Sequence, residues 1–159
     1  MKKSVLARIA AVAVAGVAIA GCSAVNPITT TRHYAASDGL QVEIGEARGL
    51  NLLVVTTAVG APAVLTGSVY NPNSTDLTVT FSIDGTTKTD VSVPAGMTTQ
   101  LGPEDGQVLV TGAAPVAPGL IAQITIGSTV SGVFATPVPV VDGTLPEYEK
   151  VITDAAAAA

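Results

Sequence analysis

The chain has 159 residues, a formal net charge of −5, and only 12% charged and 3% aromatic residues. Its length suits one domain plus an N-terminal segment. With one Cys, one His and seven Lys and Arg residues, the composition excludes an internal disulfide and a Cys/His zinc site, and it provides no basic surface for nucleic acid.

The first 21 residues have the layout of a secretory signal peptide. Lys2, Lys3 and Arg8 form a basic start without acidic residues, and residues 9–20 are all apolar or small. This run is shorter than the roughly 20 apolar residues that a membrane-spanning helix needs. The segment therefore predicts export rather than a permanent membrane helix.

The end of the apolar run carries the only Cys of the chain. Ile19-Ala20-Gly21-Cys22 resembles a bacterial lipobox, which implies that Cys22 receives a diacylglyceryl group and becomes the mature N-terminus. The alternative is an ordinary signal peptide with a chance Cys. We predict lipid anchoring at the extracytoplasmic face of the cell membrane. Because Ala, Val, Gly and Thr dominate over Lys and Asn, we expect a Gram-positive, actinobacterial-type cell surface.

Residues 22–38 show neither helical nor strand periodicity and are predicted to be a lipidated tether. The Thr cluster at residues 29–31 is either a site of O-glycosylation or part of a plain solvated linker. His33, the only histidine, falls within this tether.

From Gly39 onward the hydrophobic period is two, which is typical of strands. The alternating or apolar segments are residues 41–44, 52–55, 77–83, 90–93, 108–110, 120–126 and 130–138. Residues 52–55 and 108–110 are expected to be central strands buried on both faces. Asp84-Gly85 lies between two alternating segments and is the best hairpin candidate. No helical stripe is identified, and residues 39–153 are predicted to form an antiparallel all-β sandwich of about seven or more strands.

The C-terminal segment breaks the strand pattern. Residues 144–153 are expected either to return as a last strand or to lie over the sandwich. Residues 154–159, an Asp followed by five Ala, are predicted to be a disordered Ala-rich tail without function.

Residues able to bind a metal are few. His33 and Met97 are the only soft or imidazole ligands between the lipobox and the C-terminus, and two isolated residues do not make a copper site. Calcium would need several loop carboxylates, for which the candidates are Glu104 and Asp105 beside Asp142 or Asp84. The same Asp-containing pairs also serve as turns. We therefore predict no cofactor.

Enzyme chemistry is not expected. The chain has no G-x-S-x-G elbow, no glycine-rich phosphate loop and no H-E-x-x-H. Glu43, Glu104 and Asp105 are the carboxylates that an enzyme hypothesis would have to use. Among the few aromatic residues, Phe81 and Phe134 fit core positions, whereas Tyr70 precedes a turn and is best placed to reach the surface.

The order of turns and strands between residues 67 and 141 resembles a known family. Val93-Pro94-Ala95-Gly96, then Gly102-Pro103 and later Thr111-Gly112, follow the order found in the periplasmic copper chaperone (PCuAC-like) family and its actinobacterial lipoprotein relatives. The resemblance implies an immunoglobulin-like or cupredoxin-like sandwich. It also implies Cu(I) ligands, including a His-x-Met segment at the place of Gln107-Val108-Leu109.

A carboxamide and an aliphatic side chain do not replace imidazole and thioether at a soft metal. The family's upstream His and Met ligands also have no counterpart between residues 75 and 89. The resemblance therefore carries over the fold without the copper site.

Together these features predict a non-enzymatic surface lipoprotein that contacts an unknown envelope protein. The candidate interaction surface comprises Tyr70, Asn71, Asn73, Glu104, Asp105 and Gln107, chosen by loop position. The alternative is a noncanonical metal carrier in which His33 and Met97 meet. Copper is not the expected partner.

Overall fold

The computed structural model describes residues 5, 8, 12, 37–128 and 130–158. The chain divides into two units, Met1–Tyr34 and Ala35–Ala159, and the strands lie in the second. The predicted lipidation site at Cys22, His33 and the Thr cluster lie outside the described residues. Within the described ranges, no helix is long and apolar enough to cross a membrane.

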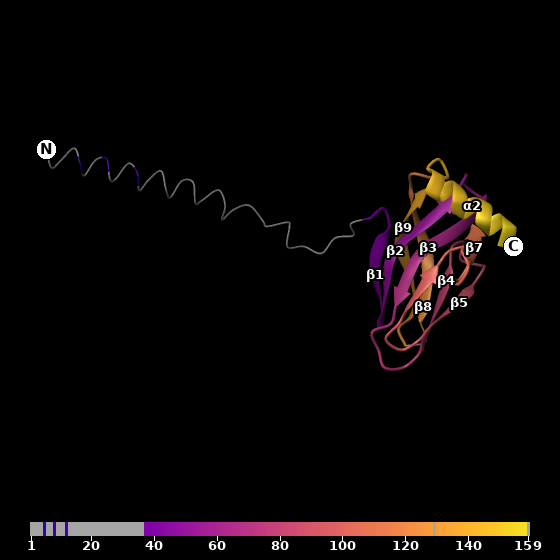
Figure 1. Cartoon of the computed structure of the whole chain (residues 1–159), viewed down its shortest axis with the longest axis horizontal. Coiled ribbons are helices and arrows are strands. Elements are labelled where there is room, and N and C mark those ends of the chain that lie inside the picture. Colours follow the sequence, from indigo (N-terminus) through magenta and orange to yellow (C-terminus); the bar gives the residue numbers. More distant parts are fainter. Residues whose placement is uncertain (1–4, 6–7, 9–11, 13–36, 129, 159) are drawn as a thin grey trace. The chain divides into compact units, whose positions relative to one another are not determined.

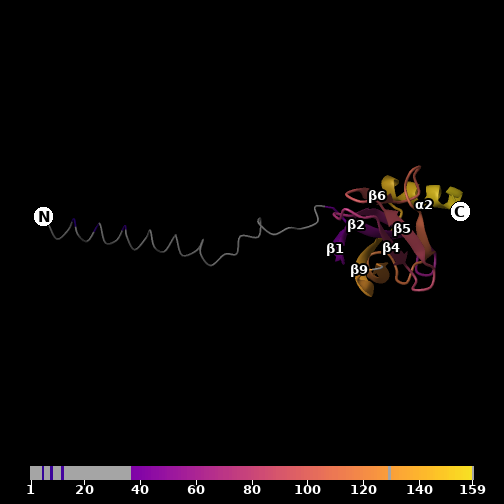
Figure 2. The same ribbon diagram turned by 90° about the horizontal axis from the view of Figure 1, so that it is seen from below.

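The nine strands form a single sheet that folds back on itself (Figures 1 and 2). The strands are β1 (Leu40–Ile44), β2 (Ala47–Thr56), β3 (Pro62–Tyr70), β4 (Leu77–Ser82), β5 (Thr89–Val93), β6 (Thr98–Leu101), β7 (Val110–Ala113), β8 (Ile121–Ser128) and β9 (Gly132–Val141). Their order is β5-β4-β8-β9-β2-β3-β6, with β1 also paired to β2 and β7 also paired to β3.

Strand β9 joins the two layers of this sheet. It pairs antiparallel with β8 over most of its length and then parallel with β2 at Val140 and Val141. The two ends of the strand order also approach each other, because Thr99 Oγ1 donates a hydrogen bond of 3.0 Å to the Ser92 carbonyl oxygen. The result is a nearly closed, mixed β-sandwich. The all-β prediction is confirmed.

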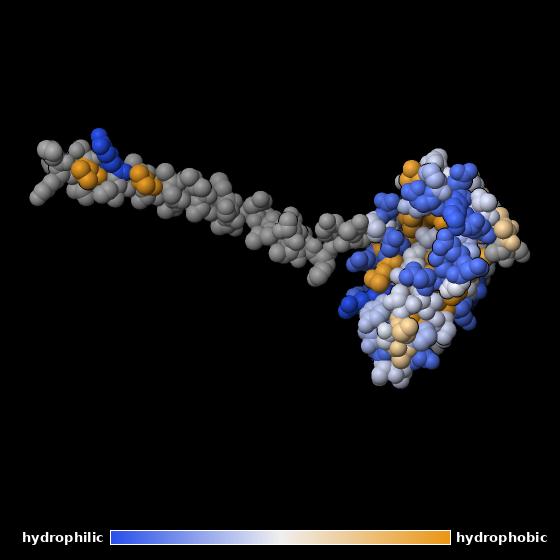
Figure 3. All heavy atoms as spheres, viewed as in Figure 1, coloured by the Kyte–Doolittle hydropathy of each residue, from blue (hydrophilic) through white to orange (hydrophobic). Residues whose placement is uncertain are grey.

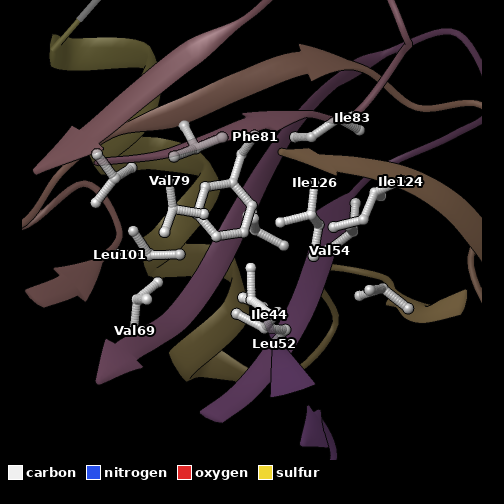
Figure 4. Close-up of a cluster of buried hydrophobic side chains, with 14 of the residues drawn as sticks. Ile44, Leu52, Val54, Val69, Val79, Phe81, Ile83, Leu101, Ile124 and Ile126 are labelled. Atoms are coloured by element: carbon white, nitrogen blue, oxygen red, sulfur yellow. The ribbon is translucent and has the colours of Figure 1, made fainter. Parts of the chain in front are cut away.

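The core lies between the layers and is built from alternating strand residues (Figure 4). Phe81 is fully buried, as predicted, and Val79 and Ile126 are also fully buried within the same cluster. Phe134 packs against the core from a partly buried position. Residues 52–55 are all buried, which confirms that β2 is a central strand covered on both faces.

The C-terminus matches the expectation in part: the segment after residue 144 lies over the sandwich and does not return as a strand, but the disorder predicted from residue 154 onward is wrong. Residues 146–158 form helix α2 (Pro146–Ala158), which includes most of the expected disordered tail. Pro146 occupies the first helical position, where its missing N–H costs nothing, and alanine has the highest intrinsic helix propensity. Tyr148, Val151, Ile152 and Ala155 follow the i, i+3, i+4, i+7 spacing of a helix with one buried stripe.

Helix α2 covers the outer face of the β2–β3 pair, as Figure 1 shows. Leu53 and Val55 lie on the side of β2 opposite the core, yet they are only 2% and 0% exposed. Their cross-strand partners, Thr66 and Val64, line clefts together with α2. The sheet face beneath α2 is therefore a second apolar layer.

Two other strand predictions need comment. The hairpin expected at Asp84-Gly85 is confirmed, because β4 and β5 pair antiparallel across the intervening loop. The strand expected at residues 108–110 begins instead at Val110. In the described part of the chain, β7 pairs only with β3, so it is an edge strand rather than a central one. A run of three apolar residues could not distinguish these positions.

Candidate functional site

One group of the predicted surface residues lies at the β3–β4 loop, where several turns meet. Asn71 accepts a hydrogen bond from the Asn73 N–H, and its amide donates to the carbonyl oxygens of Thr75 and Val93 at 2.8 and 2.9 Å. Asn71 is 0% exposed. Its assignment to an interaction surface is therefore wrong, since its side chain is fully used in holding the loop.

Asn73 and Tyr70, unlike Asn71, are partly exposed. The Asn73 amide lies 3.3 Å from the Glu46 carboxylate, which ties this loop to the β1–β2 turn. Tyr70 is partly exposed at the end of β3. Met97 belongs to the same end of the domain, because its carbonyl oxygen accepts the Asn71 N–H, and its side chain is 58% exposed.

The other group of predicted surface residues lies in the β6–β7 loop. Gln107 Nε2 donates to Glu104 Oε2 at 3.3 Å, and Glu104 Oε1 forms an ion pair of 2.8 Å with Lys150 of α2. Gly102 adopts a φ of 153°, a conformation that favours glycine, and a Cβ there would lie 2.1 Å from Gln107 Oε1. Asp105 is exposed beside this network.

These two groups do not form one surface. Tyr70 pairs with the first residue of β6, whereas the Glu104 loop follows its last residue. At about 3.3 Å per residue, the strand separates the loops by roughly 10 Å or more. The predicted surface therefore divides into two separate areas.

The N-terminal end of the domain is fixed to both β2 and α2. Asn51 Oδ1 accepts hydrogen bonds from the Ser37 hydroxyl and the Gly39 N–H at 2.6 and 2.9 Å. Asn51 adopts a φ of 54° where the β2–β3 register shifts. The Tyr148 hydroxyl donates to Asp38 Oδ2 at 2.8 Å. Partial burial and this bond raise the pKa of Tyr148 to about 12.

An apolar groove that sequence patterns did not reveal lies beside α2. It has a volume of about 540 Å³. Its floor comprises Ala63 and Val64 of β3 and Gly112 of β7, and Ile152 and Ala155 of α2 form one wall. Figure 3 shows weakly hydrophobic side chains where Figure 1 places the C-terminal end of α2. The apolar stripe of α2 was the only local signal that could have indicated this groove.

Asp84 stands at the opposite wall of the groove. Its Oδ1 accepts the Thr86 and Thr87 N–H groups, each at 2.7 Å, and its Oδ2 accepts the Ala113 N–H at 3.3 Å. The backbone hydrogen bonds from Thr87 and Thr86 hold the pKa of Asp84 well below its usual range. The bond to Asp84 thus satisfies the Ala113 N–H on the edge of β7 that does not face β3.

The described residues contain no group of three or more His, Cys, Asp or Glu side chains arranged to hold a metal. Glu104 is paired with Lys150, and Asp142 accepts two hydrogen bonds from Thr144, which lower its pKa. Of the carboxylates considered for calcium, Glu104, Asp142 and Asp84 are thus engaged in local structure, whereas Asp105 is exposed. Glu43, considered for an enzyme, forms a surface ion pair of 3.3 Å with Arg48.

Comparison with solved structures supports the fold. The chain is similar to the apo PCuAC domain from PmoF1, with a TM-score of 0.51 and 15% sequence identity over 64% of this chain and 98% of that domain. It is also similar to the copper-bound PCuAC domain from PmoF2, with a TM-score of 0.49 and 15% identity over 65% and 98% of the two chains. No family model and no curated protein matches the chain.

The domain therefore has a PCuAC-like fold, as the sequence resemblance implied. At this level of identity the likeness concerns the fold alone. What the site does depends on its own residues.

Proposed function

We propose that this chain is a lipid-anchored extracytoplasmic protein whose β-domain is a non-catalytic module that binds another envelope protein. The observation that carries the proposal is the set of contacts that the Gln107 side chain makes. The family resemblance places a metal ligand at this residue, but its amide hydrogen-bonds Glu104 and lies against Gly102. Gln107 thus stabilises a loop.

The same network favours a preformed binding surface. Lys150 bridges Glu104 of the β6–β7 loop and Asp154 of α2, which joins the loop to the helix. These ion pairs are exposed and individually weak, but they restrict the conformations of both elements. A surface that is ordered before binding loses less entropy when a partner docks.

Anchoring through Cys22 supports the envelope location. Cys22→Ser removes the nucleophile that the lipobox would modify. We expect the variant to lose radiolabelled palmitate and to leave the membrane fraction, with an unrelated substitution such as Ser23→Ala as the matched control. Retention of the label in Cys22→Ser would refute lipidation at this residue.

Protein contact is tested by photo-crosslinking of the full chain in an actinobacterial envelope. A photoreactive amino acid is placed at Asn73, Asp105 or Ala156, on three different exposed areas, and at Gln123 on the outer face of β8 as the control. We expect at least one of the first three positions to crosslink to a discrete envelope protein. Equal, diffuse labelling from all four positions would contradict the proposal.

Copper carriage is the second candidate, and the PCuAC-like fold is the observation that favours it. Met97 would be an accessible thioether ligand, with His33 as its partner. A Cu(I) competition titration against a chromogenic chelator tests this function. Stoichiometric binding that is lost in both His33→Ala and Met97→Ala would establish copper carriage. Absence of binding would reject it.

A further inference from the structure

The groove beside α2 has the dimensions of a ligand site. Its floor is the β3–β7 ladder, in which Pro62, Ala63 and Val64 pair with Ala113, Gly112 and Thr111. Helix α2 forms one wall, and the loop that follows β4 forms the other. Its volume of about 540 Å³ lies within the range of about 300–1,000 Å³ that is typical of binding pockets.

The groove is open because its lining residues are small. Ala155 and Ala156 line the groove from α2, and Gly60, Ala63, Gly112 and Ala113 line the sheet side. Val64 of the floor and Ala155 of the helix wall are only 4% and 7% exposed, so the apolar surface where they meet is well packed. An apolar group that entered the groove would lose contact with water without displacing protein side chains.

The groove carries negative charge only. Asp84 is the only charged residue among those that line it. No ion pair to Asp84 occurs within residues 37–128 and 130–158. Hydrogen bonds from Thr86, Thr87 and Ala113 fix its carboxylate at the groove wall and keep it ionised at neutral pH. A positive group on the ligand would therefore be attracted and an acidic one repelled.

The polar lining discriminates between kinds of apolar ligand. Thr57 and Thr111 also line the groove, as does Thr87, whose hydroxyl already donates to Asp84 Oδ2 at 3.0 Å. A peptide backbone offers hydrogen-bond partners to hydroxyl groups, whereas a covering hydrocarbon chain would leave them without water or partners. The combination of apolar floor, threonine lining and one carboxylate fits a peptide segment better than an acyl chain.

We propose that this groove binds a short apolar segment of a partner protein that carries a lysine or arginine, with the cationic side chain meeting Asp84. This inference rests on the proposed function, because it specifies the chemistry of the bound partner. The apolar side chains of the segment would lie between α2 and the β3–β7 ladder.

The test uses the full lipidated chain in nanodiscs and two synthetic six-residue peptides of alanine and valine. One peptide has a central lysine, and the other has glutamate at the same position. We expect the lysine peptide to bind about tenfold more tightly than the glutamate peptide, as measured by fluorescence anisotropy. Asp84→Asn should abolish this preference, while Asp90→Asn on another face should retain it.

A second pair of variants tests whether the peptide binds in the groove beside α2. Ala156→Leu places a larger side chain at the groove wall, and we expect it to weaken binding of the lysine peptide at least tenfold. Ala157→Leu changes the adjacent residue of the same helix, which does not line the groove, and should leave binding unchanged. Because both substitutions replace exposed alanines with a strong helix former, circular dichroism should show intact folding.

Three results would overturn the inference: no binding of the lysine peptide, binding that is insensitive to Ala156→Leu, or tight binding of octylamine without binding of the peptide. If the photo-crosslinks persist while the peptide fails to bind, the groove assignment is wrong but the protein-binding function stands. If no discrete crosslink forms at any position, the proposed function itself fails.

Discussion

Substitution of Leu53 tests whether α2 is a structural part of the domain. Leu53 and its neighbour Leu52 are 2% and 0% exposed, but only Leu52 belongs to the core between the layers. Leu53 owes its burial to the outer layer beneath α2. The two leucines therefore form a matched pair on opposite faces of one strand.

The expected magnitudes follow from the burial of each leucine. Truncation of a buried leucine to alanine costs about 2–5 kcal/mol, and we expect about 2–3 kcal/mol for Leu53→Ala. In a chain that ends at Thr144, Leu53 would face solvent, where the same substitution changes the free energy of unfolding by less than about 1 kcal/mol. The coupling between Leu53 and α2 is then about 2 kcal/mol.

Urea unfolding of the four variants in this double-mutant cycle, followed by circular dichroism, gives the coupling directly. Leu52→Ala is the control and should cost about 3–4 kcal/mol with or without α2, because the core does not depend on the helix. If truncation prevents folding, Ile152→Asp replaces it as the change that displaces the helix. A Leu53→Ala cost below about 1 kcal/mol in the intact chain would refute the helix as a cover.

Three further predictions concern single polar groups. Asp84→Asn should lower the melting temperature at neutral pH in thermal unfolding scans. Because the folded-state pKa of Asp84 lies below the unfolded value near 3.8, the difference in melting temperature between the variant and the wild type should shrink as pH falls from about 5 to 2. Tyr148 should ionise near pH 12, and its raised pKa stabilises the fold below about pH 10, a contribution that is lost as pH rises toward 12; ultraviolet titration should lose this late phase in Tyr148→Phe. Asn71→Asp turns the donor that serves Thr75 and Val93 into an acceptor, so we expect a loss of more than about 2 kcal/mol in urea unfolding, and a loss below about 0.5 kcal/mol would contradict the buried role of the amide.

Most of the strands were predictable because their signal is local, although β3 and β6 were not among the predicted segments. Residues 77–83 alternate strictly, and Asp84-Gly85 follows them directly, so β4 and its hairpin with β5 could be located from adjacent residues. The continuous apolar run at residues 52–55 likewise indicated a strand covered on both faces. The cover on the outer face, however, comes from residues almost a hundred positions away.

The helix and the buried amide were missed for different reasons. The stripe formed by Tyr148, Val151, Ile152 and Ala155 was present in the sequence, but the adjoining alanines resembled low-complexity sequence and concealed it. Asn71 sits in an Asn-Pro-Asn turn, where polar residues are usually exposed. Its burial depends on carbonyl groups of Thr75 and Val93, and no local pattern announces such a contact.

The groove could not be predicted because β3, β7, the loop after β4 and α2 contribute to it from four separate segments. Its small residues have no significance in sequence, since alanine and glycine are common everywhere. The groove exists only because these small residues, which come from separate segments, lie close together in the fold. Asp84 illustrates the same point, because its Asp-Gly context indicated a turn, whereas the structure also places its carboxylate against β7.

The alanines of α2 link the stability of the domain to its proposed binding function. Larger side chains at Ala156 would bury additional apolar surface in the groove, and Ala156→Leu is expected to stabilise the fold by up to about 1 kcal/mol. The same substitution should weaken binding of the lysine peptide. A groove kept open by small residues at the expense of stability is what a binding site would retain, since stabilising substitutions commonly reduce function at such sites. If Ala156→Leu neither stabilises the chain in urea unfolding nor affects peptide binding, the alanines serve only helix formation.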